Sequence, residues 1–267
     1  MRTFERLLIT GAAGGLGTQL RQNATHLAQT LRLTDIADLG EARANEELVT
    51  CDLGDYDAVL AMTEGVDAVI HLGGIALENT FENILNANIR GTYNVYESCR
   101  RRGIKRVVYA SSNHSIGFYQ REDFIDGDVP HRPDSIYGVS KAFAEDLARY
   151  YYDKFGIETV VIRIGSCFES PRDRRMLASW MSYRDFIELV GRALSVPRVG
   201  YLVVYGISDN DELFWDNRAA RILGYRPQDN AESFRAEIEA KTPVPDPFDP
   251  ATRFVGGGFC AAGHFED

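Results

Sequence analysis

Short runs of apolar residues alternate along this chain with longer stretches in which apolar residues recur at helical spacing. The short runs are rich in Val, Ile and Leu without polar alternation, which is typical of strands covered on both faces. They lie at residues 6–10, 30–34, 48–51, 68–71, 106–110, 159–164 and 202–205. Helices are predicted at residues 16–23, 56–62, 84–102, 136–155 and 183–194. The alternation predicts an α/β fold with a doubly wound, mostly parallel sheet flanked by helices.

The regular alternation ends after residue 164. A polar loop covers residues 166–175, helical pieces follow, and residues 241–250 contain four prolines, which argue against regular structure there. These prolines and the glycines at 256–258 predict a tail laid over the body of the protein or onto a neighbouring subunit, with a loose terminus as the alternative. No composition break or repeat marks a second domain, so we predict a single domain over residues 1–267.

Composition and charge narrow the class of protein. A chain of 267 residues with 45% hydrophobic and 25% charged residues can bury one core, and it is not a disordered, collagen-like or coiled-coil chain. The 29 basic and 39 acidic residues give a net charge of −10, and no basic block is longer than residues 100–102, so nucleic acid is not expected as a partner. No apolar run reaches the roughly 18 residues that would predict a membrane-spanning helix.

The cysteines and the N-terminus bear on the compartment. The four cysteines are far apart, without metal-binding spacing, so we predict no metal site and interpret them as buried thiols of a reducing compartment. They are Cys51, Cys99, Cys167 and Cys260. Arg2 and Arg6 precede an apolar stretch as in a signal peptide, but Glu5 and three glycines interrupt that pattern. We therefore predict a first strand there and a cytoplasmic protein.

A glycine-rich turn, Thr10-Gly-Ala-Ala-Gly-Gly-Leu-Gly17, joins the first predicted strand to the first helix. Gly11 permits the tight turn, Gly14 lets backbone N–H groups approach a pyrophosphate, and Gly17 lets the helix pack on the strand. Asp35 ends the next strand, where a carboxylate accepts hydrogen bonds from the two ribose hydroxyls of NAD and repels the 2′-phosphate of NADP. No arginine follows Asp35 directly, so the motif predicts a Rossmann fold that binds NAD.

This cofactor divides the predicted domain. Residues 1–165 are expected mainly to bind NAD, and residues 166–267 mainly to form a small C-terminal substrate-binding part with an irregular tail. Asp52, after the third strand, either accepts a hydrogen bond from the adenine amino group or caps the helix that starts at Tyr56. After the fourth strand, Gly73 and Gly74 leave room for the cofactor to pass, and His71 is interpreted as a hydrogen-bonded core histidine.

Tyr137 and Lys141 are four residues apart on a predicted helix and therefore share one face. An ammonium about 5 Å away, helped by a positive nicotinamide ring, is expected to lower the pKa of Tyr137 from about 10 toward about 7.5. That range suits a general base. Ser111 and Ser112 end the fifth strand, and a serine hydroxyl there can hold the substrate oxygen that loses its proton.

These motifs together resemble those of the extended, epimerase-like branch of the short-chain dehydrogenase/reductase superfamily. The Gly-x-x-Gly-x-x-Gly turn, Asp52-Leu53 and Asn88-Ile-Arg-Gly-Thr92 carry the resemblance. It implies a catalytic triad of Ser112, Tyr137 and Lys141 with Asn88 in a supporting position. The NAD-binding positions that it implies are Gly11, Gly14, Gly15, Leu16, Gly17, Asp35, Ile36, Asp52, Leu53, Leu72, Gly73, Gly74, Ile75, Asn88, Lys141 and Cys167.

Only about 100 residues follow the last cofactor strand, which favours a small free substrate over a sugar nucleotide. The stretches Ser-Ser-Asn-His114, Arg174-Arg-Met-Leu177, Trp215-Asp-Asn217 and Gly-Gly-Gly-Phe259 resemble the members of this branch that oxidise free uronic acids. That resemblance implies oxidation of the ring form of D-glucuronate or D-galacturonate at C1 by NAD⁺, giving the aldarolactone. The substrate-binding positions that it implies are Ala76, Ser112, Asn113, His114, Ser166 and Arg175.

Several alternatives stay open at this point. Arg174 competes with Arg175 for the uronate carboxylate, and Ala76, where the family often has serine, leaves only a backbone contact. The enzyme alternatives are another small-sugar or sugar-acid dehydrogenase and a compact epimerase. A non-catalytic NAD-binding sensor is a different class, but such proteins typically lack the Tyr/Lys pair. The expected partners are a uronic acid and further copies of the chain in a homo-oligomer.

Overall fold

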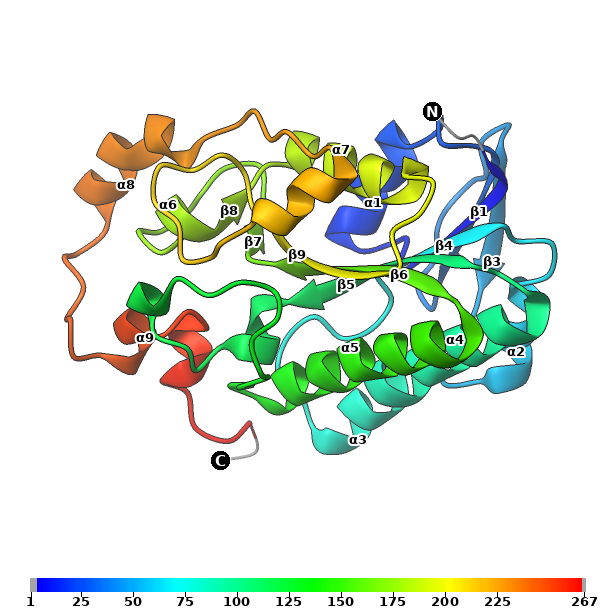
Figure 1. Cartoon of the computed structure of the whole chain (residues 1–267), viewed down its shortest axis with the longest axis horizontal. Coiled ribbons are helices and arrows are strands. Elements are labelled where there is room, and N and C mark those ends of the chain that lie inside the picture. Colours follow the sequence, from blue (N-terminus) through cyan, green and yellow to red (C-terminus); the bar gives the residue numbers. More distant parts are fainter. Residues whose placement is uncertain (1–3, 266–267) are drawn as a thin grey trace.

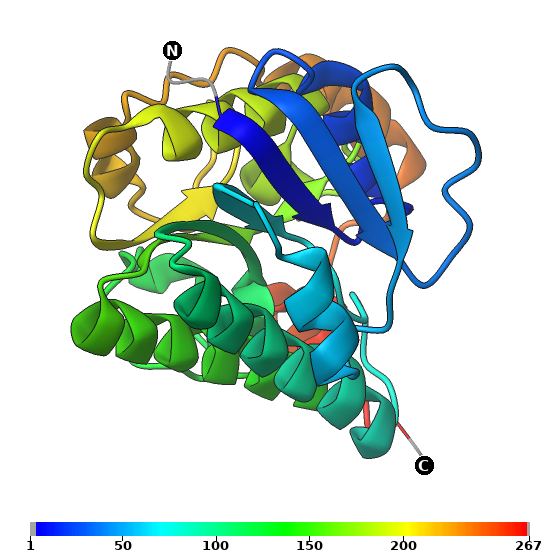
Figure 2. The same cartoon turned by 90° about the vertical axis from the view of Figure 1, so that its right-hand side faces the viewer.

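The computed structural model describes residues 4–265 and shows a parallel seven-stranded sheet between two layers of helices (Figures 1 and 2). Residues 1–3 and 266–267, which include Arg2 and both ends of the predicted single domain, lie outside the described residues. The strand order β3-β2-β1-β4-β5-β6-β9 confirms the predicted doubly wound sheet. The strands are β1 (Phe4–Thr10), β2 (Ala28–Asp35), β3 (Glu46–Thr50), β4 (Ala68–His71), β5 (Arg106–Ser112), β6 (Glu158–Ile164) and β9 (Tyr201–Gly206).

Helices cover both faces of the sheet. α1 and α7 pack on one face, and α2, α4 and α5 pack on the other (Figure 1). The strands between them are buried on both sides; Leu7, Leu8 and Ile9 of β1 are fully buried, as expected for an apolar run without alternation. The α-helices are α1 (Gly15–Asn23), α2 (Tyr56–Met62), α3 (Phe81–Ile84), α4 (Gly91–Arg102), α5 (Ile136–Phe155), α6 (Met176–Ser179), α7 (Tyr183–Ser195), α8 (Arg235–Lys241) and α9 (Pro250–Arg253).

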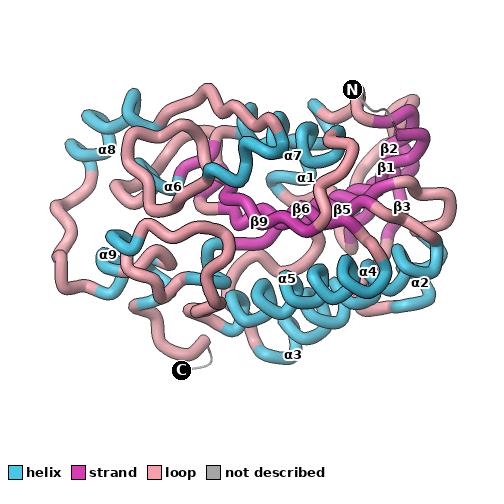
Figure 3. Tube along the Cα trace, viewed as in Figure 1, coloured by secondary structure: helices cyan, strands magenta, loops and turns pink. Residues whose placement is uncertain are grey.

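Most predicted boundaries agree with the structure to within two residues, but the helix predicted at residues 84–102 is wrong as a single α-helix. It consists of α3, a π-helical segment (Leu85–Arg90) and α4. The sequence pattern also missed a two-stranded sheet of β7 (Ser166–Cys167) and β8 (Trp180–Met181), because two-residue strands are too short for any periodicity. Figure 3 shows that loops dominate the part of the molecule around α6, α8 and α9.

Short 3₁₀ turns account for much of the remaining regular structure. They lie at Asn113–Ile116, Arg121–Asp123, Arg218–Leu223, Ala231–Phe234 and Gly257–Cys260. The first of these directly follows β5 and places the residues after Ser112 beside the start of α5. The small β7-β8 sheet, 3₁₀ turns and the tail lie after β6 and build the part of the protein around the carboxyl ends of β5 and β6.

The sheet reverses its direction of growth at β1. β2 and β3 lie on one side of it and β4, β5 and β6 on the other, so Thr10 pairs with both Thr34 and His71. A crevice at the carboxyl ends of such strands is where doubly wound sheets bind ligands. His71 itself is fully buried and hydrogen-bonds Thr10 and Thr92 at 2.7 and 3.1 Å, which confirms the interpretation as a core histidine. Burial lowers its pKa to about 3, so it is neutral.

The part of the C-terminal tail around Val255 lies over the body of the protein, so the alternative of a loose terminus is wrong for this part of it. Val255 is fully buried; its N–H donates to the Tyr119 carbonyl, and the next N–H donates to Gly117, both at 2.9 Å. Pro250, expected in an irregular segment, begins α9 behind the capping carboxylate of Asp249. Proline is favoured at this position, because the first N–H groups of a helix have no partner in the helix.

The cysteines agree only in part with the prediction of buried thiols. All four cysteines are free thiols, but only Cys51 and Cys99 are buried, while Cys167 and Cys260 are partly exposed. No helix among residues 4–265 is long and apolar enough to cross a membrane, and no cluster of metal-ligating side chains occurs in the same range. The cytoplasmic location and the homo-oligomer stay predictions.

A buried ion pair joins α5 to β6. Glu145 and Arg163, whose side chains are 1% and 2% exposed, approach to 2.8 Å. The Glu145 carboxylate also accepts hydrogen bonds from Ser111 and Ser115 and lies 3.0 Å from the His131 ring. Burial opposes its ionisation, but the hydrogen bond to His131 and the charge of Arg163 outweigh burial and lower the pKa of Glu145 to about 2.

Glu145→Gln should lower the free energy of unfolding by about 3–5 kcal/mol, because it leaves the Arg163 charge buried without a partner. Urea denaturation at neutral pH measures the change. The folded-state pKa lies below the ordinary value of 4.5, so the ionised carboxylate stabilises the protein above that pH and the difference between wild type and variant shrinks as pH falls toward about 2. A change under about 1 kcal/mol would contradict the prediction, and Glu145→Gln/Arg163→Met should recover part of the loss.

Candidate active site

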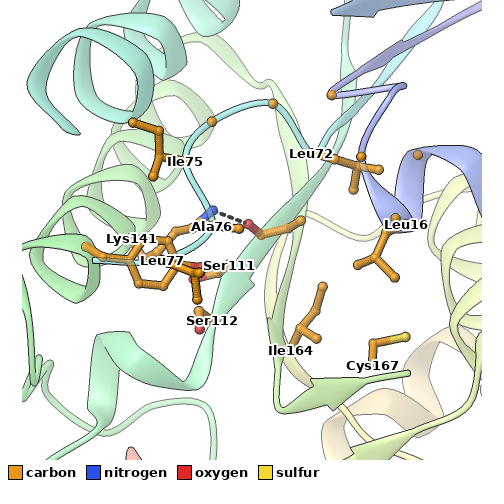
Figure 4. A pocket seen from close by; sticks show the side chains of 18 of the residues that line it. Leu16, Leu72, Ile75, Ala76, Leu77, Ser111, Ser112, Lys141, Ile164 and Cys167 are labelled. Carbon is orange, nitrogen blue, oxygen red and sulfur yellow. Dashed lines mark hydrogen bonds between the residues drawn. The ribbon is translucent and has the colours of Figure 1, made fainter. Parts of the chain in front are cut away.

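A cavity of about 950 Å³ opens at the carboxyl ends of β1, β4, β5 and β6, at the crevice where the sheet reverses. This volume is at the upper end of the range for small-molecule sites. Figure 4 shows aliphatic side chains such as Leu16 and Ile164 on one side of it and Ser111, Ser112 and Lys141 on the other. The predicted cofactor and substrate residues, except Asn88 and Asn113, therefore line one cavity.

The glycine turn fits the pyrophosphate of a dinucleotide. Gly11 has φ +71°, and a Cβ there would lie 2.8 Å from the backbone nitrogen of Gly73; a Cβ at Gly17 would lie 2.2 Å from the Gly11 carbonyl. Neither position admits a side chain. The first turn of α1 has no acidic residue and no side-chain cap, so its N–H groups face the cavity mouth without a competing anion.

Asp35 lies at the end of β2 and lines the cavity. Its carboxylate accepts hydrogen bonds from the Ala13 and Ala37 N–H groups at 3.0 and 3.1 Å, which orient it. The cavity-lining cations are Lys141 and Arg175, and neither comes from β2 or the segment after it. This end of the cavity suits the two ribose hydroxyls of NAD and offers no cation to a 2′-phosphate.

The structure decides between the two interpretations of Asp52 and corrects the predicted cofactor contact of Asn88. Asp52 lines the cavity, but the alternative that it caps α2 is wrong: its carboxylate accepts from Gly54, and Asp55 caps the helix. Asn88 does not line the cavity, because the π-helical segment turns its amide toward Ile75. The other predicted NAD positions all line it: Gly11, Gly14, Gly15, Leu16, Gly17, Asp35, Ile36, Leu53, Leu72, Gly73, Gly74, Ile75, Lys141 and Cys167.

Tyr137 and Lys141 share the buried face of α5, as their spacing predicts. α5 begins after Ser135, whose hydroxyl accepts from the Gly138 N–H. The Lys141 ammonium lies 5.5 Å from the centre of the Tyr137 ring and donates to the Ala110 carbonyl at 2.8 Å (Figure 4). Both side chains line the cavity close to the end of β5.

The expectation that Lys141 lowers the pKa of Tyr137 is wrong for the protein without bound cofactor. Burial raises the pKa of Tyr137 to about 12, and the charge of Asp134 acts in the same direction, while the hydrogen bond with Ser112 lowers it. Burial also lowers the pKa of Lys141 to about 8, against the charge of Glu145. The spacing of Tyr137 and Lys141 predicts the attraction between phenolate and ammonium but not the loss of hydration. For two groups inside the fold, this loss has the larger effect on both pKa values.

Ser112 and His114 both reach the cavity from the end of β5. The Ser112 hydroxyl accepts from the His114 N–H at 3.2 Å. His114 is held on two sides, by Asp134 at 2.8 Å from its Nδ1 and by the ring of Phe259, which stacks on it at 3.9 Å. Asn113, predicted between them as a substrate contact, does not line the cavity; it is buried and donates to the tail carbonyl of Val255.

The structure separates the two candidate arginines. Arg175 lines the cavity, donates to the Val255 carbonyl and to Ser166, and has no carboxylate partner within residues 4–265. Burial and the charge of Arg121 lower its pKa to about 10, so it stays protonated at neutral pH. Arg174 pairs with Glu239 at 3.4 Å and does not line the cavity.

Sequence reasoning missed the residues that hold this site in place. Asp134 and Glu78 reach it through turns whose geometry has no local pattern, and Phe259 entered only as part of a family motif. The position of Asp134 directly before the helix cap Ser135 was the one available signal, but it predicts a helix start and not a histidine partner.

Comparisons with known proteins agree with this geometry. The model of the NAD dependent epimerase/dehydratase family matches residues 7–184. The chain is 52% identical over 263 residues to the uronate dehydrogenase of Pseudomonas putida, covering 98% of each. It is similar to the structure of glucuronic acid dehydrogenase from Chromohalobacter salexigens, with a TM-score of 0.97 and 52% identity over 99% and 100% of the two chains. For a uronate dehydrogenase mutant from Agrobacterium tumefaciens complexed with NAD, the TM-score is 0.96 at 49% identity, over 98% and 99%.

The raised pKa of Tyr137 predicts that its phenol stays protonated across the neutral range. An ultraviolet titration of phenolate in wild type minus Tyr137→Phe, without cofactor, should show no step between about pH 6 and about pH 10. A difference step below about pH 9 would mean that Lys141 outweighs burial after all.

Asp35→Ala should weaken NAD⁺ binding by about ten- to a hundredfold, because charge-assisted hydrogen bonds to two hydroxyls are lost. The preference for NAD⁺ over NADP⁺ should relax as well. Titration calorimetry with both cofactors measures the two effects, and Asp38→Ala is the matched control, since that carboxylate does not line the cavity. Equal binding of NADP⁺ and NAD⁺ by the wild type would contradict the role given to Asp35.

Proposed function

The chain belongs to the uronate dehydrogenases of the NAD-dependent epimerase/dehydratase family and is an NAD-dependent oxidoreductase, and on this premise we propose that it oxidises free uronic acids at C1. The proposed substrates are the ring forms of D-glucuronate and D-galacturonate, and the proposed product is the aldarolactone. We further propose Tyr137 as the general base, Ser112 and Lys141 as its catalytic partners, and Arg175 as the group that binds the carboxylate.

The observation that carries this proposal is the pairing of a hydroxyl-oxidising set with an unpaired cation in one cavity. Tyr137, Ser112 and Lys141 suit proton removal from an alcohol, whereas Arg175 suits a carboxylate. In a chain of net charge −10, the half-buried guanidinium of Arg175 has no acidic partner among the described residues, and an anionic ligand would offset its partial loss of hydration.

The proposed reaction removes a hydride from C1 and a proton from the C1 hydroxyl. Bound NAD⁺ supplies the hydride acceptor. Ser112, hydrogen-bonded to Tyr137, orients the C1 hydroxyl. Tyr137 first releases its phenol proton to solvent, and the phenolate oxygen then takes the proton of the C1 hydroxyl. Because burial disfavours the phenolate, the Lys141 ammonium, still protonated at neutral pH with a pKa of about 8, offsets the negative charge that Tyr137 must carry.

The remaining contacts fix the sugar. Arg175 holds the Val255 carbonyl with its Nε and Nη2 hydrogens, so a uronate carboxylate either meets the other hydrogens of this side chain or displaces that carbonyl. Asp134 binds Nδ1 of His114, which leaves Nε2 for a sugar hydroxyl. Ser166 adds a hydroxyl, and Ala76 offers only its backbone; Asn113 is left to support the tail.

Two other functions compete with this one. A dehydrogenase of neutral sugars or a compact epimerase would use the same Tyr137 and Lys141 but would not need Arg175, whereas another sugar-acid dehydrogenase would use all three. A non-catalytic NAD sensor would need none of the three, so their convergence beside the cofactor cavity speaks against that class. The substrate panel below separates all of them.

Arg175→Ala should lower kcat/KM for glucuronate by about 30-fold or more, because one partner of a partly buried charge pair is lost. Glucose, which lacks the carboxylate, should be affected far less. The measurement is NADH absorbance with glucuronate, galacturonate, glucose and a sugar nucleotide, for wild type, Arg175→Ala and the control Arg174→Ala.

Other kinetic results would contradict the proposed substrate class or the role of Arg175. A wild type that prefers neutral sugars or sugar nucleotides would overturn the proposed substrate class. Loss of the uronate preference only in Arg174→Ala would transfer the carboxylate to that residue. If neither change matters, the carboxylate is held elsewhere, with His114 the next candidate.

A further inference from the structure

The loop that leaves β4 is tied to the helix that carries Tyr137. This segment, residues 72–80, which we name the β4 loop, lines the cavity from Leu72 to Leu77. In Figure 4 it arches from Leu72 past Ile75 toward the side of the cavity where Lys141 lies. At its far end the two carboxylate oxygens of Glu78 accept the N–H groups of Ile136 and Tyr137, at 2.9 and 2.7 Å.

A second connection runs from the same loop to the same residue. Asn88 accepts from the N–H of Ile75 at 2.8 Å and donates to its carbonyl at 3.0 Å. The Asn88 amide also donates to the Ser140 hydroxyl at 3.0 Å, and Ser140 donates to the Tyr137 carbonyl at 2.6 Å. Both backbone polar groups of Tyr137 are therefore hydrogen-bonded to side chains linked to the β4 loop.

Glu78 is well suited to this task. The first N–H groups of a helix have no partner within the helix and carry its partial positive charge. A carboxylate that accepts two of them satisfies both hydrogen bonds and favours the helix start electrostatically. Ser135 caps a different group, the Gly138 N–H. Glu78 is the side chain that accepts the backbone N–H of Tyr137 itself.

We propose that Glu78 is a positioning residue, which couples the occupation of the β4 loop by ligand to the placement of Tyr137. A ligand in the cavity contacts residues 72–77, and the loop passes any displacement to the first turn of α5 through Glu78. The kinetic consequence rests on the proposed role of Tyr137 as base; the coupling itself does not.

Amide hydrogen exchange tests the coupling without any sugar. In Glu78→Ala, the amides of Ile136 and Tyr137 should exchange at least about tenfold faster, while that of Val139, bonded to the Ser135 carbonyl, keeps its rate. NAD⁺ alone should slow exchange at Ile136 and Tyr137 in the wild type but not in the variant. Asp55→Ala is the matched control, because Asp55 caps α2 with the same chemistry and does not line the cavity.

Steady-state kinetics with a uronate test the consequence for Tyr137. Glu78→Ala should lower kcat by about tenfold or more, with the KM for sugar and the Kd for NAD⁺ changed less than about threefold. Glu78→Gln keeps one acceptor and the side-chain shape, so its kcat should lie between those of the wild type and Glu78→Ala. Asp55→Ala should keep the wild-type kcat.

Unchanged exchange at Ile136 and Tyr137 in Glu78→Ala would overturn the proposal, as would faster exchange with an unchanged kcat. It would also be overturned if kcat and NAD⁺ binding fell together with a Tm lower than that of Asp55→Ala, since that pattern describes a purely structural cap. If the alanine variant does not fold, Glu78→Gln decides by the same measurements. If the wild type oxidises no uronate, the proposed function fails while the exchange experiment with NAD⁺ still tests the coupling.

Discussion

The carboxylate of Glu145 connects the parts from which the candidate active site is built. It lies two helical turns beyond Tyr137 and one beyond Lys141 on the same face of α5, and it pairs with Arg163 on β6. The Ser111 hydroxyl from the end of β5 donates to the same carboxylate. Removing this charge would leave Arg163 unpaired inside the protein and would loosen the helix that carries Tyr137 from the strand that carries Ser112.

Burial sets the electrostatics of the cavity. Loss of hydration raises the pKa of Tyr137 and lowers those of Lys141 and Arg175, and no carboxylate among residues 4–265 pairs with either cation. The cavity lining contains two cations, Lys141 and Arg175, and three carboxylates, Asp35, Asp52 and Asp173. An anionic ligand group therefore fits only beside Lys141 and Arg175, where it would offset a charge that the fold has partly removed from water.

The C-terminal tail holds several side chains of the candidate active site in place. The carbonyl of Val255 holds Arg175 and Asn113, and Phe259 stacks on His114, so the tail positions side chains from two distant segments. Arg121 anchors the same tail by donating to the Ala251 carbonyl. A substitution in the tail would therefore reach the proposed substrate contacts without touching the glycine turn.

The sequence by itself determined the layers of this protein and the cofactor end of its cavity. Short apolar runs without alternation are typical of strands buried on both faces, and the regular change between such runs and helical stretches predicts the layers. Gly11 has a positive φ and a Cβ at Gly17 would meet the Gly11 carbonyl, so both glycines are required by the turn itself. The shared face of Tyr137 and Lys141 follows from helical spacing alone.

Tertiary structure decided what local patterns do not encode. Whether Arg174 or Arg175 enters the cavity depends on how the loop after β7 turns, and a rotation of one residue exchanges them. The pKa of Tyr137 depends on how much water the fold removes, and that outweighed the attraction to Lys141 counted from spacing. The ties from Glu78 to Tyr137 and from Phe259 to His114 join residues far apart in sequence, and such contacts exist only once the chain has packed.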